Sequence, residues 1–431
     1  MLVLEAQDTI GGSTRTAQLT EPGFRHDVCS AIHPLAAASP FFRSLELDVE
    51  LIDPPAALAH PLDDGSAVMV RRSLDATADG LGADADTYRR LVERLVSDWR
   101  ELVKEILRPV VHLPRHPRTL ARFTRAALRT ADVKGFRTEK ARALFAGAAA
   151  HSVLPLDRRG TAGFGLILLT LAHAVGWPVP RGGSQAIGDA LADRVRAAGG
   201  AIETGHKVMS LRELPPSRVV LCDITPRQLL TLAGEQLPSR YRRRLEGWRY
   251  GPGAFKLDYA LDAPIPWRAA EVADAATVHL GGTATEIGRS EDDAWRGVHN
   301  ERPYVLLAQQ SLFDDTRAPA GKHAAWAYCH VPHGSTTDMT EQVEGQIERF
   351  APGFRETILA RAARGPAELE RDNENLVGGD ISGGANTLRQ LVRRMPYSTP
   401  LPWLYLCSAA TAPGAGVHGM CGHLAAQAAL K

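Results

Sequence analysis

Cysteine and net charge are both scarce in this sequence. Five cysteines occur among 431 residues, and none forms a Cys-x-x-Cys pair. This odd number and spacing argue against a disulfide framework and favour reduced thiols in a reducing compartment. Lys and Arg total 50 against 49 Asp and Glu, so the formal net charge of +1 gives no indication of a nucleic-acid partner. The start shows no basic-then-apolar signal, and we expect a cytoplasmic protein.

Long apolar segments are scarce as well. Residues 160–180 carry no Asp, Glu, Lys or Arg, and such a length could cross the ~30 Å hydrocarbon core of a bilayer. His173, Pro178 and several glycines interrupt the stretch, so that its strongly apolar part covers only Leu166–Leu171. We therefore predict a buried helix here rather than a membrane span.

The remaining composition is that of a globular protein with a sizeable core. Hydrophobic residues make up 44% and charged residues 23% of the chain, both ordinary values. The length predicts two or three domains, or one enzyme built from two domains.

The first sixteen residues carry a pattern typical of nucleotide binding. Leu2–Leu4 is an uninterrupted apolar run, as expected for a strand buried on both faces. Glu5 follows at its carboxyl end, where an acid in a doubly wound sheet accepts hydrogen bonds from ribose hydroxyls. Two glycines allow the backbone to approach a ligand closely, and an arginine fork suits a pyrophosphate. The candidate contacts in this stretch are Glu5, Gly11, Gly12, Arg15 and Thr16.

A second pattern lies near the other end of the chain. Leu404–Cys407 is predicted to be a strand, the glycine-rich segment 411–420 a loop, and the small-residue segment after it a helix. A glycine-rich turn before a helix presents backbone N–H groups and a positive dipole end to an anion or an electron-rich ring. The candidate contacts in this loop are Gly416, Val417, His418, Gly419 and Met420.

Together the two patterns resemble FAD-dependent oxidoreductases of the phytoene desaturase and amine oxidase type. The resemblance rests on the strand ending in Glu5-Ala6 with its glycine pair, and on the run Pro413–Gly422. It implies an α/β fold: a Rossmann-like FAD-binding domain, truncated at its N-terminus, with an inserted α+β substrate domain. FAD would lie extended between the two patterns, with the backbone at Val208 near the adenine. The implied reaction is hydride transfer from an apolar small molecule to the flavin.

One element expected in such a fold is not found. In dinucleotide-binding folds a strand and a G-x-G-x-x-G turn precede the acid by ~20 residues, whereas four residues precede Glu5 here. No other G-x-G-x-x-G follows a strand-like run and opens a helix. The alternative interpretation is therefore a truncated, non-catalytic remnant or a partner subunit that retains little FAD.

Alternating strand and helix signals set the predicted domain boundaries. We assign residues 1–75, 180–236 and 376–431 to the FAD-binding domain, and residues 76–179 and 237–375 to the substrate domain. Within them we predict one helix over 86–107, a strand over 207–211 and a half-buried strand over 255–261. A basic stretch at 115–142 would be a solvated helix face or a peripheral membrane contact.

Two further site hypotheses remain open. An amine oxidase is the second enzyme class, and it would need an aromatic cage beside the flavin. Cys329, His330 and His333 are close enough in sequence to suggest zinc, although a fourth ligand is not evident. No side chain is identified as a general base. The candidate cage residues are Tyr397, Trp403 and Tyr405.

Overall fold

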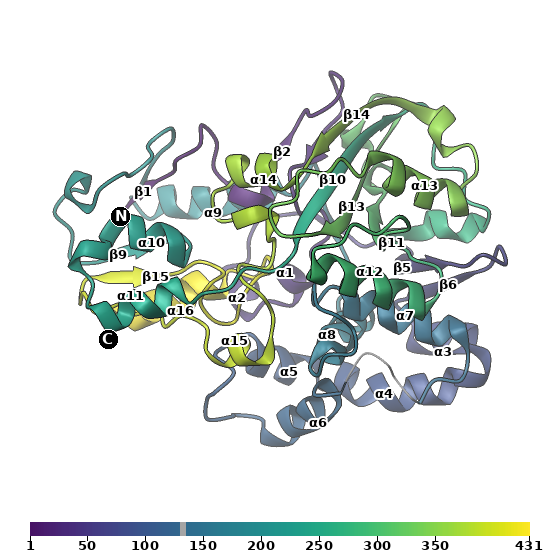
Figure 1. Cartoon of the computed structure of the whole chain (residues 1–431), viewed down its shortest axis with the longest axis horizontal. Helices are drawn as coiled ribbons and strands as arrows, with labels where there is room; N and C mark the ends of the chain where they lie inside the picture. The colour runs from purple at the N-terminus through teal and green to yellow at the C-terminus, as the bar shows by residue number, and fades with distance from the viewer. Residues whose placement is uncertain (130–134) are drawn as a thin grey trace.

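The computed structural model describes residues 1–129 and 135–431. A seven-stranded sheet with its helices forms one part of the molecule, and two short parallel strand pairs with four helices form the other (Figure 1). The chain crosses between the parts several times, because the second part draws on the N-terminus, the middle and the C-terminus of the sequence. The mixed α/β class predicted from the sequence is confirmed.

The large sheet has the strand order β14-β10-β13-β12-β11-β5-β6. Its neighbours are antiparallel except for β11 and β5, which are parallel. Apolar side chains of the central strands and of α13 build one core against it. The strands are β5 (Ala56–Pro61), β6 (Ala67–Arg71), β10 (Gly253–Leu261), β11 (Ala275–Leu280), β12 (Val305–Ala308), β13 (His323–Val331) and β14 (Ile358–Arg364).

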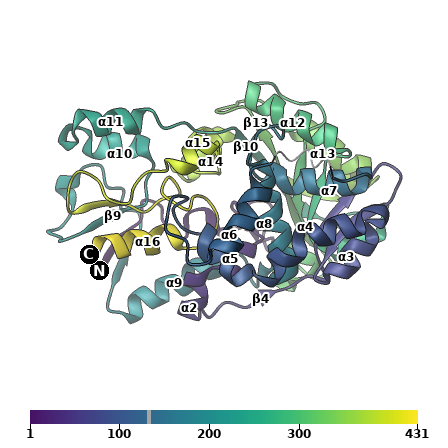
Figure 2. The same cartoon turned by 90° about the horizontal axis from the view of Figure 1, so that it is seen from below.

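Helices cover the sheet, most of them on the side that faces the viewer in Figure 2. The largest core joins β5 and β6 to α4, α7 and α8. Its helices and their neighbours are α3 (Leu74–Gly80), α4 (Ala85–Ser97), α5 (Trp99–Ile106), α6 (Pro117–Ala127), α7 (Glu139–Ala150), α8 (Thr161–Ala174), α12 (Ala284–Arg296) and α13 (Thr340–Phe350).

The buried helix predicted in the uncharged segment is confirmed as α8. Ten of its residues are buried, among them Leu166, Leu169 and Leu171. Within residues 1–129 and 135–431, no helix is both long and apolar enough to cross a membrane.

The second part contains two parallel strand pairs, β1 (Leu2–Leu4) with β8 (Ala201–Glu203) and β9 (Val220–Cys222) with β15 (Leu404–Leu406). Its four helices are α9 (Gln185–Ala197), α10 (Pro226–Ala233), α11 (Ser239–Glu246) and α16 (Met420–Ala429). Helix α10 begins with the capping box of Thr225 and Gln228, which satisfies backbone N–H groups at the helix start.

Short elements connect the two parts. They are β2 (Thr16–Ala17), β3 (His26–Asp27), α1 (Pro34–Ala38), α2 (Pro40–Leu45), β4 (Leu51–Ile52), β7 (Val179–Pro180), α14 (Pro366–Asp372) and α15 (Leu388–Val392).

Three expectations from the sequence need correction. The helix expected over 86–107 is divided at Asp98 into α4 and α5, where Asp98 leaves helical geometry and binds Arg122 of α6. Residues 207–210 form no strand, and a short 3-10 helix, Leu211–Glu213, follows them. Strand β10 is buried along its whole length, not on one face only, because β13 and β14 flank it and packed residues cover both faces.

The domain boundary expected at residue 75 also differs from the pairing of the strands. Strands β5 and β6 pair with each other, and β5 runs parallel to β11. They therefore extend the large sheet, although the sequence analysis assigns them to the FAD-binding domain. Strand–strand partners this distant in sequence leave no local signal.

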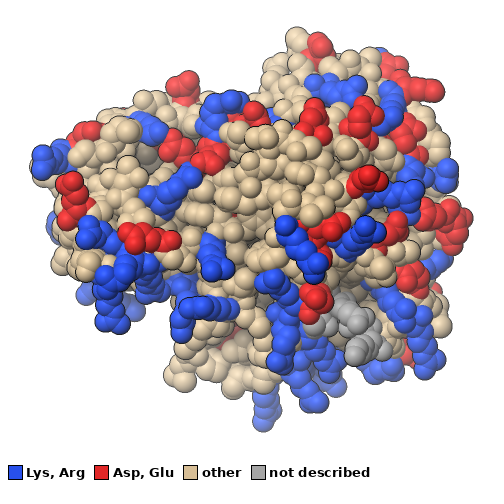
Figure 3. Space-filling view, in the orientation of Figure 1, with Lys and Arg blue, Asp and Glu red and all other residues tan. Residues whose placement is uncertain are grey.

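Basic side chains gather along the lower edge of the molecule, in the region of α4 and α6 (Figure 3). The exposed arginines of α6 and its flanks are Arg115, Arg118, Arg122, Arg125 and Arg129. Residues 130–134 of the predicted basic stretch lie outside the described residues.

Candidate functional site

A cavity of about 2360 Å³ connects the two parts of the molecule. One end is lined by β1, by β9 and by the segments that follow them. The other end reaches the face of the large sheet, and we call it the inner chamber. The inner chamber is lined by Trp177, Thr277, Trp326, Tyr328 and His330.

Strands β1 and β9 line the first end, and each has one edge without a partner strand in the described part of the chain. In the described part of the chain β1 pairs only with β8 and β9 only with β15. Leu2 is 40% exposed and Leu221 41% exposed, so β1 is not buried on both faces as predicted. In a dinucleotide-binding fold, a further strand and a phosphate-binding turn would lie beside β1, next to this open edge. The absence of that unit stays a prediction.

Glu5 lies at this end, directly after β1. Its Oε1 accepts a hydrogen bond from the Gln7 N–H at 2.8 Å, and the residue lines the cavity. Asp223 follows β9 and also lines the cavity, and desolvation together with the nearby Glu5 charge raises the Asp223 pKa. A carboxylate at the end of a parallel strand therefore faces the cavity, where it could accept hydrogen bonds from the hydroxyl groups of a ribose.

Gly11 and Gly12 line the cavity in conformations that favour glycine, with φ of 113° and 53°. A Cβ on Gly11 would lie 3.2 Å from Arg15 Cγ. The glycine pair thus permits a tight loop against the cavity.

The side chains of Arg15 and Thr16 form hydrogen bonds within the protein and do not line the cavity. Arg15 donates from Nε to the Gly12 carbonyl at 3.0 Å and from Nη2 to the Asp372 carbonyl at 2.8 Å. Thr16 donates to Asp27 at 2.9 Å. Neither residue lines the cavity, so contact with a pyrophosphate stays a prediction for both.

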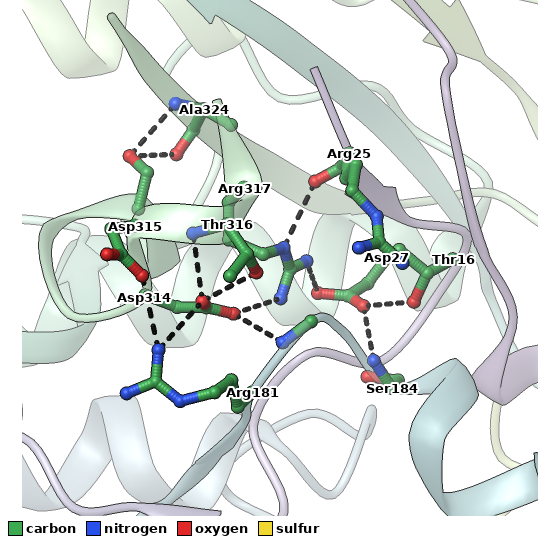
Figure 4. Close-up of polar contacts among 12 residues, drawn as sticks. Thr16, Arg25, Asp27, Arg181, Ser184, Asp314, Asp315, Thr316, Arg317 and Ala324 are labelled. Atoms are coloured by element: carbon green, nitrogen blue, oxygen red, sulfur yellow. Dashed lines mark hydrogen bonds and ion pairs between the residues drawn. The ribbon is translucent and has the colours of Figure 1, made fainter. Parts of the chain in front are cut away.

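Figure 4 shows the buried network that holds this loop to the large sheet. Asp27 accepts hydrogen bonds from Thr16, from the Ser184 N–H at 2.8 Å and from the Arg317 guanidinium. Burial alone would raise the Asp27 pKa, but the Arg317 charge and these hydrogen bonds outweigh it, and the pKa lies below its ordinary value. Because Arg317 is fully buried, this ion pair ties the candidate nucleotide loop to the opposite part of the molecule.

The C-terminal glycine-rich loop forms another wall of the cavity. Gly416, Val417, His418 and Gly419 line it, as does Val208 from across the space. His418 Nδ1 accepts a hydrogen bond from the Met420 N–H at 3.0 Å, while its buried Nε2 has no partner. Burial lowers the His418 pKa to about 4, so the ring is neutral near pH 7.

Met420 begins helix α16 and points away from the cavity. It packs in an apolar cluster with Trp99 and Leu171. Gly419, Cys421 and Gly422 do line the cavity, so the N-terminus of α16 opens onto it. A helix N-terminus attracts anions and electron-rich groups.

Lys256 adds a buried cation to the cavity wall. Its Nζ donates to the Asp258 carboxylate, which also accepts from Arg364 at 3.1 Å. Burial lowers the Lys256 pKa to about 8, with Asp258 opposing and Arg364 assisting the shift. A group that titrates close to neutrality inside a cavity is a candidate for proton transfer. Its signal in the sequence is a lysine between Phe255 and Leu257 in an apolar strand.

Alternate residues of strand β13 point their side chains into the inner chamber. Trp326, Tyr328 and His330 share one face of β13 and line the cavity, whereas Cys329 belongs to the apolar core on the other face. His330 Nδ1 lies 2.9 Å from both carboxylate oxygens of Glu291 in α12. Glu291, Lys256 and the aromatic residues of the chamber are not recognisable as site residues from the sequence alone.

The zinc hypothesis is not supported. His333 binds the Gly251 carbonyl through Nδ1 at 2.9 Å, and Cys329 and His330 point to opposite faces of β13. Across residues 1–129 and 135–431, no group of three or more His, Cys, Asp or Glu side chains could hold a metal ion.

The aromatic cage proposed for an amine oxidase is also misplaced. Tyr397 donates its hydroxyl to the Ala412 carbonyl at 2.9 Å, and Trp403 packs against the core around β9 and β15. Tyr397, Trp403 and Tyr405 do not line the cavity. The aromatic residues that do so are Phe41 of α2, Phe164 of α8, Trp177 after α8, and Trp326 and Tyr328 of β13.

Comparison with known proteins agrees with the fold. No family model matches the chain. It is 29% identical over 322 residues to rat pyridine nucleotide-disulfide oxidoreductase domain-containing protein 2, a match that covers 63% of this chain and 55% of the relative. The mouse protein of the same name is 28% identical over the same shares. The chain thus spans about half the length of the curated relatives it matches.

Solved structures with the same fold are more distant in sequence. An oxidoreductase from Methanosarcina mazei has a TM-score of 0.60 at 14% identity, covering 99% of this chain and 94% of that one. Wild-type putrescine oxidase bound to putrescine has a TM-score of 0.57 at 14% identity, covering 100% and 93%. Cyclohexylamine oxidase from Brevibacterium oxydans has 0.57 at 12%, covering 99% and 92%. At these identities the likeness shows a shared fold.

Proposed function

We propose that this chain is a flavin-dependent oxidoreductase that binds FAD in the cavity and oxidises an apolar small molecule in the inner chamber. The observation that carries the proposal is the continuity of the cavity from Glu5 to the chamber, past the glycine-rich loop and the α16 N-terminus. An extended dinucleotide needs such a passage, with an acid at one end and a ring platform at the other.

The residues present fit the two ends of FAD. Glu5 would hold the ribose, Gly11 and Gly12 would allow close backbone approach, and the backbone around Gly416 and Gly419 would face the flavin. Among the described residues no further strand pairs with β1 or β9, and the groups that would hold the pyrophosphate stay a prediction. When bound, the flavin would supply hydride acceptance, while this chain would position the substrate and exclude water.

The chamber favours a neutral, apolar substrate over an amine. Phe164, Ile167 and Trp177 line the cavity. Among the described residues the acids that line it are Glu5, Asp223, Asp372 and Glu374. Asp372 is paired with Arg364 and Glu374 with Lys207, and Glu5 and Asp223 belong to the other end. An ammonium group in the chamber would therefore lack a free carboxylate.

The first test is the visible absorption spectrum of the purified chain, titrated with FAD and then reduced. We expect a protein-bound flavin spectrum that bleaches on reduction. Glu5→Gln should weaken FAD binding about tenfold, since the loss of one charge-assisted hydrogen bond costs about 1.5 kcal/mol. Glu203→Gln is the matched control, because Glu203 ends the neighbouring strand β8 and does not line the cavity.

Absence of bound flavin in a cooperatively folded protein would overturn the proposal. The non-catalytic remnant or partner subunit would then become the better interpretation of this chain.

A further inference from the structure

The inner chamber contains a buried histidine whose two ring nitrogens have different surroundings. His330 is 4% exposed and Glu291 2% exposed. Nδ1 of His330 faces both oxygens of the Glu291 carboxylate at 2.9 Å. Nε2 is buried and has no hydrogen-bond partner, while the residue lines the cavity.

Among the residues that the structure describes, the Glu291 carboxylate contacts one hydrogen-bonding side chain. In the described part of the chain, His330 is its only hydrogen-bond partner. A carboxylate on Nδ1 fixes the tautomer with the proton on that nitrogen and leaves a lone pair on Nε2. Because an unsatisfied buried nitrogen costs free energy, its persistence beside a cavity indicates a ligand that supplies the missing partner.

A second buried His–Glu pair shows what a structural pair looks like. His112 binds Glu105 through Nε2 at 2.6 Å and the Pro109 carbonyl through Nδ1 at 2.7 Å. Glu105 also accepts the N–H groups of Arg115 and His116. Every ring nitrogen is satisfied there, and neither His112 nor Glu105 lines the cavity.

We propose that His330, oriented by Glu291, recognises a hydroxyl group on an otherwise apolar ligand in the inner chamber and accepts its proton. The hydroxyl O–H would donate to Nε2. On transfer, the O–H bond breaks, an Nε2–H bond forms, the ligand becomes an alkoxide, and the imidazolium is balanced by the Glu291 carboxylate. His330 is the catalytic residue of this step and Glu291 a positioning residue. The inference rests on the proposed function for placing the substrate in the chamber.

The neighbouring histidines do not compete for the proton. His151 and His279 lie with their Nε2 atoms 3.1 Å apart. Burial, and then the charge of a protonated His330, lowers the His151 pKa to about 3. Burial also holds the His279 pKa well below its ordinary value. Both rings therefore stay neutral, and neither competes with His330 for the proton.

The test measures binding without flavin, so it is independent of FAD retention. Cinnamyl alcohol and its methyl ether serve as probes, because O-methylation replaces the hydroxyl proton, the only hydrogen-bond donor, by a methyl group. Isothermal titration calorimetry gives both affinities. We expect the alcohol to bind at least about tenfold more tightly than the ether, as one hydrogen bond to a buried acceptor allows. His330→Phe should abolish this preference, Glu291→Gln should reduce it, and Glu105→Gln should leave it unchanged.

A spectroscopic measurement tests the role of Glu291 directly. With ¹⁵N-labelled histidine, the His330 signals are identified by their loss in His330→Phe. We expect a protonated Nδ1 and an unprotonated Nε2 at neutral pH, and a shift of this tautomer in Glu291→Gln but not in Glu105→Gln.

Equal affinity for alcohol and ether in the unsubstituted protein, or no binding of the alcohol, would overturn the inference. A His330 ring that is protonated on Nε2 in the unsubstituted protein would also overturn the inference. This measurement needs only one folded variant, His330→Phe, which is used to assign the signals. If flavin fails to bind but the alcohol preference is present and depends on His330, the proposed function fails and the recognition site stands.

Discussion

Arg317 and Asp27 show how single residues can hold the candidate site in place. Both side chains are fully buried and separated by 290 positions in the sequence. Arg317 also donates from Nε to the Arg25 carbonyl at 3.2 Å. Removing one partner of such a pair leaves a buried charge without compensation, which costs more than the pair itself contributes.

Arg317→Met is therefore expected to lower the free energy of unfolding by about 3–5 kcal/mol at pH 7. Asp27 has a lowered pKa in the folded protein, so its stabilising effect is present above its unfolded pKa and disappears as the pH falls through the folded value. In the variant the unpaired carboxyl protonates more readily, so the penalty should shrink toward pH 4. Urea denaturation at several pH values measures both effects.

The control for this substitution is Arg196→Met. Arg196 forms an exposed pair with Asp193, and such pairs contribute less than about 1 kcal/mol. An equal loss in both variants, or a penalty that grows in acid, would contradict the role assigned to the buried pair.

At the scale of elements, one glycine in the loop before α16 and one inside that helix differ sharply in their surroundings. Gly416 has φ of 125°, and a Cβ there would lie 2.6 Å from Leu35 Cδ1. Gly422 lies inside the helix, and a Cβ there would meet nothing within 4 Å. Both line the cavity. The first glycine is required by backbone conformation and packing, and the second is not.

Gly416→Ala should therefore destabilise the protein by about 1–3 kcal/mol, since an L side chain is strained at that φ, and should weaken FAD binding by moving the loop. Gly422→Ala should be neutral or gain up to about 1 kcal/mol from helix propensity. Thermal denaturation and FAD titration compare the two variants. Similar melting temperatures and similar FAD affinities would contradict the distinction.

At the scale of the whole molecule, an apolar loop and a basic helix lie next to the cavity. Val110, Val111 and Leu113 are 55%, 74% and 90% exposed, and they precede the arginines of α6. Ile106 and Leu107, directly before this loop, line the cavity. An exposed apolar loop flanked by arginines is suited to the surface of an anionic membrane. We propose that this face contacts such a membrane, from which an apolar substrate could enter.

Flotation with vesicles tests this proposal. The protein should bind vesicles of phosphatidylserine and phosphatidylcholine more strongly than vesicles of phosphatidylcholine alone. The double substitution Val111→Ser with Leu113→Ser should reduce binding several-fold, since each exposed apolar side chain loses about 1–2 kcal/mol of burial in the bilayer. Leu359→Ser is the control, because Leu359 is 50% exposed on β14. Equal loss in both variants, or no dependence on phosphatidylserine, would refute the contact.

The sequence by itself determined the local elements and the end of the cavity at which Glu5 lies. The apolar run of β1 ending at Glu5, the capping box of α10, the apolar helix α8 and the glycine-rich loop before α16 are all encoded within a few neighbouring residues. Their signals are periodicity, caps and glycines, which depend on short-range sterics and hydrogen bonds.

Only the tertiary structure decided the inner chamber and the network that supports the loop. His330 and Glu291 come from β13 and α12, Lys256 comes from β10, and Arg317 reaches Asp27 across the molecule. Strand β5 lies beside β11 although the paired residues Ala56 and Ala275 are 219 positions apart in the sequence. Such neighbours are chosen by packing and by the burial of charge, which act between distant segments and leave no trace in local sequence periodicity.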